Sequence, residues 1–166
     1  MPILLGGLFK LANNRSPIEA FREIPNKLAY EHLEIERFVR RHGLSRFRMN
    51  PHFPVNTLQL MRGAVAAEAL GCAPAYAEAM FAAMWEDGRN MADPAEVTAV
   101  LIAAGLDTPA LLERSQDPQV KARLLANTQS AFERGAFGAP TFFVGDEMFF
   151  GKDRLGEVEE ALQQHR

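Results

Sequence analysis

A proline-led hairpin that runs into a helix, close to the C-terminus, constrains the fold of this chain more than any other feature. Residues 142–144 (Phe-Phe-Val) are aromatic and β-branched, which favours a strand. Residues 145–146 (Gly-Asp) supply turn chemistry, and residues 148–150 (Met-Phe-Phe) return as a second strand. Gly151 breaks that strand, and Asp153 is placed to cap a helix. The pattern predicts two short strands and a final helix.

The proline at the start of this hairpin is a candidate for a cis peptide bond. Pro140 follows small residues and precedes an apolar strand, which is a typical setting for a cis bond. With such a bond, the N–H and C=O of Ala139 are expected to be free to pair with an extended peptide as a short added strand. The alternative is a proline that simply begins an edge strand.

The rest of the chain divides into mixed segments at both ends and a helical block between them. The short apolar run over 2–9 predicts a buried strand, and the spacing of apolar residues over 26–42 predicts a helix. Between 56 and 134 an acceptor side chain before proline recurs as a helix-start signal, at Asp93-Pro94, Thr108-Pro109 and Asp117-Pro118. The sequence therefore predicts an α/β part over 1–55 and 135–166, with an all-helical insertion domain over 56–134.

Composition and charge exclude several classes of protein. The net charge is −3, which gives no electrostatic footprint for nucleic acid. We see neither an apolar run long enough to span a membrane nor a signal peptide, so we expect a cytoplasmic protein that does not act in a membrane. The single cysteine, Cys72, excludes an internal disulfide. No second cysteine or histidine stands at metal-ligand spacing, so no metal site is expected.

Five stretches of the sequence resemble one protein family. Residues 135–155 resemble the C-terminal signature of 2-hydroxychromene-2-carboxylate isomerases and kappa-class glutathione transferases, in the DsbA-like branch of the thioredoxin superfamily. The resemblance covers essentially the whole chain in order, and its other stretches are 4–10 (LLGGLFK), 13–17 (NNRSP), 50–57 (NPHFPVNT) and 85–90 (WEDGRN). It implies an α/β thioredoxin-like (DsbA-like) fold with a large all-helical insertion.

One part of the family pattern has no counterpart in this chain. The family carries a central strand followed by a helix, with a catalytic serine at the start of that helix. The chain begins where the second strand is expected, so we expect the first β-α unit to be missing and assign the catalytic serine to no residue. The predicted sheet of about three short strands would also have an unpaired internal edge, which is poorly protected unless a further segment or a partner covers it.

The resemblance implies a glutathione site built from both ends of the chain. Ala139 and Pro140 would pair with the cysteinyl backbone of glutathione, and Lys152 and Asp153 would hold its γ-glutamyl end at a helix N-terminus. Asn14 would donate to the glycyl end or order the loop. The alternatives are that Asp153 only caps the helix beside a solvated Lys152, and that Asn14 is only a turn residue.

Three further residues are candidates for contact with the substrate. The resemblance places a substrate-binding lysine at Lys10, where a cation can hold the carboxylate of a chromene-carboxylate. His52 and Asn56 belong to a loop with two prolines that would wall the pocket. The alternatives are that Lys10 is a solvated lysine, that His52 is a surface histidine and that Asn56 only caps the next helix. Three residues at helical spacing would line an aromatic substrate pocket between the helical insertion and the sheet, or simply form a core stripe: Phe81, Met84 and Trp85.

The leading hypothesis is a glutathione-dependent isomerase, as the resemblance implies. The thiol would add transiently to an unsaturated carbon of a small aromatic substrate, allow ring opening and rotation, and then be eliminated and regenerated. A kappa-class transferase would instead leave a conjugate. A DsbA-like oxidoreductase needs a Cys-x-x-Cys pair, which the chain lacks, and a catalytically incomplete binding module is a further alternative. The resemblance is compatible with a homodimer.

Overall fold

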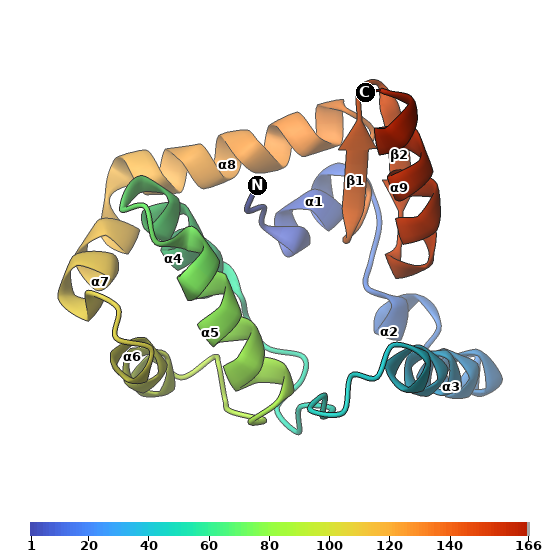
Figure 1. The fold of residues 1–166 in the computed structure, drawn as a ribbon, viewed down its shortest axis with the longest axis horizontal. Coiled ribbons are helices and arrows are strands. Elements are labelled where there is room, and N and C mark those ends of the chain that lie inside the picture. The colour runs from blue at the N-terminus through green and yellow to red at the C-terminus, as the bar shows by residue number, and fades with distance from the viewer. Residues whose placement is uncertain (166) are drawn as a thin grey trace.

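The computed structural model describes residues 1–165, which form nine α-helices and a two-stranded hairpin (Figure 1). In chain order the elements are α1 (Leu5–Leu11), α2 (Pro17–Ala20), α3 (Pro25–Arg41), α4 (Leu58–Ala69), α5 (Ala73–Trp85), α6 (Pro94–Ala103), α7 (Thr108–Gln116), α8 (Pro118–Glu133), β1 (Thr141–Val144), β2 (Glu147–Phe150), the 3₁₀ helix η1 (Lys152–Arg154) and α9 (Leu155–Gln164). Within residues 1–165 no helix is both long and apolar enough to cross a bilayer.

Helices α4 to α8 enclose the main hydrophobic core. α4 lies at its centre and packs against α5, α7 and α8. The largest fully buried side chains of this core include Met91, Leu101, Leu111 and Leu124, which come from the α6, α7 and α8 segments and the loop before α6. This cluster corresponds to the segment that the sequence predicted as helical. The domain boundaries themselves stay a prediction, because α8 also packs against α1 outside this segment.

Carboxylate side chains begin three of these helices. Asp93 and Asp117 accept hydrogen bonds from the backbone N–H groups of the second residue of α6 and α8, at 2.8 and 2.7 Å. The start predicted at Thr108 is wrong by one residue, because Asp107 caps α7 and Thr108 is its first helical residue. The Asp107 carboxylate accepts from the N–H of Ala110 at 3.1 Å, which satisfies one of the free helix-terminal donors.

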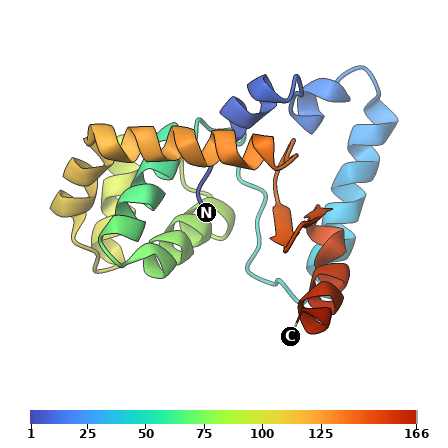
Figure 2. The same cartoon turned by 90° about the horizontal axis from the view of Figure 1, so that it is seen from above.

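Helix α8 connects the helical cluster with the hairpin. Figures 1 and 2 show it as a long element that runs from α7 to the hairpin. Near its C-terminal end, Leu8 of α1 is fully buried in a second small core with Ala131 and Ala136, beside the partly buried Phe132 and Phe143. α8 therefore fixes the position of the N-terminal segment relative to the hairpin.

The predicted hairpin is confirmed. β1 and β2 pair antiparallel with Thr141 opposite Phe150 and Val144 opposite Glu147. Gly145 opens the turn with φ of 56°, a left-handed conformation that suits glycine. The peptide bond between Ala139 and Pro140 is cis, as predicted, and the bond between Phe53 and Pro54 is also cis. α9 packs against β1.

The strand predicted over 2–9 is wrong, since this segment forms α1. Its first residues are held by side chains of α8 instead of a neighbouring strand: Asn127 Nδ2 donates to the carbonyl of Pro2 at 3.0 Å, and Leu4 N–H donates to Thr128 Oγ1 at 3.0 Å. A short apolar run does not distinguish a strand from a buried helix, and here the contact of Leu8 with α8 favours the helix. The described residues hence contain two strands and not three.

Candidate functional site

Five residues that the sequence assigned to glutathione lie around one loop, which we call the proline-loop site (Asn14, Ala139, Pro140, Lys152 and Asp153). Asn14 Nδ2 donates to the carbonyl of Phe137 at 2.9 Å, which joins the N-terminal segment to this loop. The N–H of Gly151 donates to the carbonyl of Pro140 at 3.0 Å, which places η1 beside the proline. The fold thus brings residues more than a hundred positions apart to one place.

The end of α1 positions Asn14. Asn13 follows the helix with φ of 49°, the left-handed conformation that commonly ends helices and that asparagine tolerates well. The N–H of Asn14 then donates to the carbonyl of Phe9 at 2.8 Å, and its side-chain oxygen accepts from the N–H of Arg15 at 2.8 Å. The amide nitrogen of the side chain therefore points at the loop before Pro140.

Ala139 presents a backbone N–H and a C=O that no other residue in 1–165 hydrogen-bonds. The residue is exposed, so both groups are open to a ligand. Gly138, directly before it, is buried because the ring of Phe150 lies against it: a Cβ at this position would come within 2.9 Å of Phe150 Cε2. An extended peptide would find a rigid loop with one free donor and one free acceptor here.

The prediction that Asp153 caps the last helix is wrong. Gly151, with φ of 98°, precedes η1 without a side-chain cap, and α9 begins after Arg154. The carboxylate of Asp153 instead pairs with Lys152 Nζ at 2.6 Å. Lys152 is not simply solvated, because its side chain is 35% exposed and its Nζ lies 4.6 Å from the centre of the Phe38 ring of α3. Asp153 is 72% exposed and is open to a ligand.

The three residues assigned to the substrate are less closely gathered. Lys10 lies exposed in the last turn of α1, four residues before Asn14. His52 and Asn56 are exposed in the loop before α4, where the side-chain oxygen of Asn56 accepts from Leu58 N–H at 3.0 Å in a capping contact. No hydrogen bond or ion pair joins His52 or Asn56 to the proline-loop site within the described part of the chain.

The sequence did not predict the residue that holds the loop before α4 in place. Asn50 is buried, and its amide nitrogen donates to the carbonyls of Met84 and Arg89 at 2.7 and 2.8 Å. Its side-chain oxygen accepts from the N–H of His52 at 2.7 Å. The sequence predicted only a loop pre-set by its two prolines. The structure adds that this loop is fixed to the end of α5.

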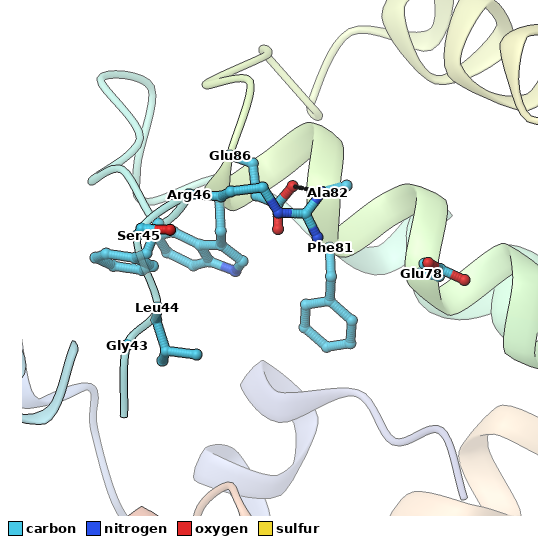
Figure 3. A pocket seen from close by; sticks show the side chains of 10 residues that line it. Gly43, Leu44, Ser45, Arg46, Glu78, Phe81, Ala82 and Glu86 are labelled. Atoms are coloured by element: carbon cyan, nitrogen blue, oxygen red, sulfur yellow. Dashed lines mark ion pairs between the residues drawn. The ribbon is translucent and has the colours of Figure 1, made fainter. Parts of the chain in front are cut away.

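Two neighbouring cavities flank the aromatic face of α5. The predicted trio of Phe81, Met84 and Trp85 lines an apolar cavity of about 480 Å³. Phe81 and Trp85 also border a more polar cavity of about 510 Å³ on the other side. Figure 3 shows Arg46 reaching across this second cavity toward Glu86, which it meets at 3.2 Å. The apolar cavity lies between α4 and α5 and not between the helical insertion and the sheet, and Met84 and Trp85 also belong to the main hydrophobic core, so a substrate pocket at this trio stays a prediction.

Contacts and burial shift the pKa values of three groups. A hydrogen bond from the Arg37 guanidinium lowers the pKa of the partly exposed Glu34 carboxyl on α3, and the same contact raises the pKa of Arg37. Burial raises the pKa of the Tyr76 phenol, whose hydroxyl donates to the carbonyl of Leu60 at 3.0 Å. Over residues 1–165 no three His, Cys, Asp or Glu side chains gather where they could hold a metal ion.

Comparison with known proteins connects this architecture to a family. Residues 1–163 match the DSBA-like thioredoxin domain family. The chain is 30% identical over 145 residues to the 2-hydroxychromene-2-carboxylate isomerase of Pseudomonas putida, a match that covers 85% of this chain and 68% of the relative. The chain belongs to this isomerase family, with a DsbA-like thioredoxin fold. The predicted family and fold class are thereby confirmed.

Other family members agree with this assignment. The 2-hydroxychromene-2-carboxylate isomerase of Sphingobium xenophagum is 34% identical over 90 residues, covering 54% of this chain and 46% of the relative. The protein of the same name from Pseudomonas sp. (strain C18) is 30% identical over 145 residues, 85% of this chain and 65% of the relative. A solved selenomethionine 2-hydroxychromene-2-carboxylate isomerase superposes with a TM-score of 0.81 at 28% identity, covering 98% of this chain and 77% of that chain.

These matches also define the extent of the resemblance. The chain spans between 46% and 68% of the length of the three curated relatives. The relatives carry the name of an isomerase, so the chain is a member of an enzyme family. The superposition on the solved isomerase covers 98% of this chain and so includes both the hairpin and the helical cluster.

Proposed function

We propose that the protein contributes to a glutathione-dependent isomerase that acts on aromatic acids of the 2-hydroxychromene-2-carboxylate type. The observation that carries the proposal is the exposed backbone of Ala139, with a free donor and a free acceptor, between Asn14 and the Lys152–Asp153 pair. A tripeptide with charged ends needs this combination of a short strand partner and separate polar contacts at each end.

The residues of the proline-loop site fit glutathione group by group. The N–H and C=O of Ala139 are suited to the backbone of the cysteinyl residue. Asp153 is suited to the α-ammonium of the γ-glutamyl end, because its ion pair with Lys152 is exposed and an exposed pair exchanges partners at little cost. Asn14 orders the loop through Phe137 and lies beside the site. Glutathione, when bound, supplies a thiol that adds transiently to the substrate.

Lys10 is the residue that we assign to the carboxylate of the aromatic substrate. It is exposed on the last turn of α1, and none of the ion pairs found over residues 1–165 involves it. A free ammonium attracts an anion, and Lys10 lies four residues before Asn14 of the proline-loop site. Orientation of two bound reactants is a large part of the rate gain in reactions of this kind. His52 and Asn56 stay predictions as wall residues.

The location and assembly of the protein are also proposals. A cytoplasmic location is supported by the single cysteine and by the proposed use of glutathione, which is abundant in the reducing cytosol. A homodimer stays a prediction from the resemblance.

The test is a turnover assay with two readouts. The protein is mixed with 2-hydroxychromene-2-carboxylate in the presence and absence of glutathione, and the substrate spectrum and the free-thiol concentration are both followed. The proposal expects isomerisation that requires glutathione and leaves the thiol concentration unchanged. Loss of thiol in step with substrate would indicate a transferase. A rate equal to that of the protein-free control would leave only a binding role.

A further inference from the structure

The cavity beside the C-terminal half of α5 lies against the loop over 43–47, and we call it the loop cavity. Its volume is about 510 Å³, within the usual range of small-molecule sites. The loop lines one side of it. Residues at intervals of three and four, which share one face of α5 and its C-terminal cap, line the other side: Glu78, Phe81, Ala82, Trp85 and Glu86. None of the lining residues belongs to the proline-loop site.

Three contacts hold the loop against α5. The backbone N–H of Arg48 donates to the carbonyl of Trp85 at 2.6 Å. The ring of Phe47 stacks on that of Trp85, with ring centres 5.8 Å apart and an angle of 20°. The third contact is the ion pair between Arg46 and Glu86, which Figure 3 shows across the cavity. Backbone and aromatic contacts therefore fix the walls independently of the ion pair.

The ion pair shows which chemistry this cavity accepts. Arg46 Nη1 lies 3.2 Å from Glu86 Oε2, and the Arg46 side chain is 80% exposed whereas that of Glu86 is 28% exposed. Glu86 is thus the more fixed partner, and an exposed cation such as Arg46 is exchanged for another at little cost. A carboxylate can accept two parallel hydrogen bonds from a planar guanidinium or amidinium group.

Phe81 offers an aromatic face close to this carboxylate. Its ring is 66% exposed, and Figure 3 shows it projecting from α5 on the side where Leu44 of the loop lies. Cations and flat rings are both attracted to the face of an aromatic ring. An exposed aromatic side chain in the lining of a cavity is therefore suited to hold the ring of a ligand.

The charges of the lining favour a cation over an anion. Two carboxylates, those of Glu78 and Glu86, face one guanidinium, that of Arg46. Glu78 takes part in none of the ion pairs found over residues 1–165. Arg48 lies next to the lining, but its guanidinium donates to two backbone carbonyls of the loop, each at 2.8 Å.

The spacing of the two carboxylates favours a molecular cation over a metal ion. Glu78 and Glu86 are separated by about two turns of α5, or about 12 Å along its axis. A single metal ion cannot contact carboxylates that are so far apart. A molecule that pairs with Glu86 can extend along α5 over Phe81 toward the second carboxylate.

We propose that the loop cavity binds a small aromatic cation, with a planar amidinium or guanidinium group on Glu86 and its ring against Phe81. The ligand displaces Arg46, whose side chain then extends into solvent. This inference does not depend on glutathione binding, and the ligand has the opposite charge to the aromatic acids of the proposed function.

The binding test uses benzamidine as the cation and benzamide as its neutral analogue of the same shape. Calorimetry measures affinity, and quenching of the single tryptophan, Trp85, reports binding beside the loop. We expect saturable benzamidine binding that quenches Trp85 and is tighter than benzamide binding by about tenfold or more. Equal affinity for the two compounds, or no binding at millimolar benzamidine, would overturn the proposal.

Two carboxylate variants locate the cation. Glu86→Gln removes the charge but keeps the size of the side chain, and it should weaken benzamidine binding by about tenfold or more. Glu68→Gln is the matched control, because Glu68 lines the cavity between α4 and α5 and not the loop cavity. This control should bind benzamidine as the wild type does. Equal weakening in the two variants would place the ligand elsewhere and reject the site.

Arg46→Ala gives an effect of the opposite sign. It removes the cation that the ligand must displace, so benzamidine binding should become tighter by about a few-fold. Arg41→Ala is the control for the loss of one positive charge, because Arg41 is exposed and does not line the cavity. Equal tightening in both variants would show only a general electrostatic attraction. Weaker binding in Arg46→Ala would show that Arg46 supports the ligand. Either result would contradict the proposal.

Discussion

Tyr76 shows how a single residue shapes both the core and the cavity between α4 and α5. It is 3% exposed, and its hydroxyl donates to the carbonyl of Leu60 in α4. Burial disfavours the phenolate and raises the pKa of the group above that of a tyrosine in water. The folded state therefore favours the neutral phenol over the phenolate.

This linkage predicts a loss of stability at alkaline pH. In the unfolded chain the phenol ionises near its ordinary pKa of about 10, whereas in the folded chain it stays neutral to higher pH. The stabilisation is thus complete below pH of about 10 and falls as the pH rises further. Tyr76→Phe should remove this alkaline decline and cost about 1 kcal/mol at neutral pH through the lost hydrogen bond. Urea unfolding at pH 8 and above pH 10 measures both effects, and an equal alkaline decline in the variant would contradict the account.

Asn50 holds the loop over 50–57 in place through buried hydrogen bonds. Replacement by alanine removes its hydrogen bonds to the backbone of Met84, Arg89 and His52, so the carbonyls of Met84 and Arg89 lose the side-chain donor. Asn50→Ala should lower the free energy of unfolding by about 2–3 kcal/mol. Asn90→Ala is the control, because Asn90 makes one exposed contact, to the N–H of Ala92. If the two variants lose similar amounts of unfolding free energy, the buried hydrogen bonds of Asn50 contribute no more to stability than an exposed contact does.

At the scale of elements, α4 and α5 are held together by a close approach at a glycine. A Cβ on Gly63 of α4 would lie 2.2 Å from the Tyr76 hydroxyl of α5, a separation that heavy atoms do not reach without displacement. Gly63→Ala should therefore destabilise the protein by about 1–3 kcal/mol despite the higher helix propensity of alanine. Gly6→Ala is the control, since nothing lies within 4 Å of a Cβ there.

The double variant sharpens this prediction. Tyr76→Phe removes the hydroxyl that the new methyl group meets first, so its combination with Gly63→Ala should be less destabilising than the sum of the two single changes. If thermal or urea unfolding instead gives a loss of stability in the double variant equal to the sum of the two single losses, the contact between the new methyl group and the Tyr76 hydroxyl is not the cause of the destabilisation.

The elements also show what sequence patterns can and cannot specify. The hairpin, α3 and the helix starts at Asp93 and Asp117 follow from local chemistry, and the sequence predicted them. Residues 2–9 were predicted as a strand because a short apolar run fits either structure, and the deciding contacts with Asn127 and Thr128 come from far along the chain. The close approach of Tyr76 to Gly63 is likewise a tertiary property that no local pattern contains.

At the scale of the whole molecule, α8 brings the N-terminal segment beside the loop before Pro140. The sequence predicted the residues of the proline-loop site through resemblance, and the fold brings Asn14 to Phe137 beside them. It did not predict that Asp153 pairs with Lys152, because a cap and an ion pair are equally compatible with the local sequence. Nor did it separate a core stripe from a cavity wall on α5, which only the packing of the 53–57 loop decides.

Asn14 gives a prediction that depends on this long-range connection. Asn14→Ala removes the hydrogen bond to the carbonyl of Phe137 and should weaken glutathione binding by about tenfold. Asn13→Gly is a suitable control, because glycine retains the left-handed conformation of that position and keeps the Asn14 side chain. Thermal unfolding at increasing glutathione concentration measures the effect through mass action. Equal responses in the two variants would remove Asn14 from the site.

The most direct test of the central claim is a titration of the isotopically labelled protein with glutathione, followed by amide resonances in NMR spectra. The account predicts saturable shifts of the Ala139 backbone N–H, of the Asn14 side-chain amide and of the amides of Lys152 and Asp153, with the resonances of α4 to α7 unchanged. Shifts confined to α4–α7, or no saturable shift at Ala139, would contradict it.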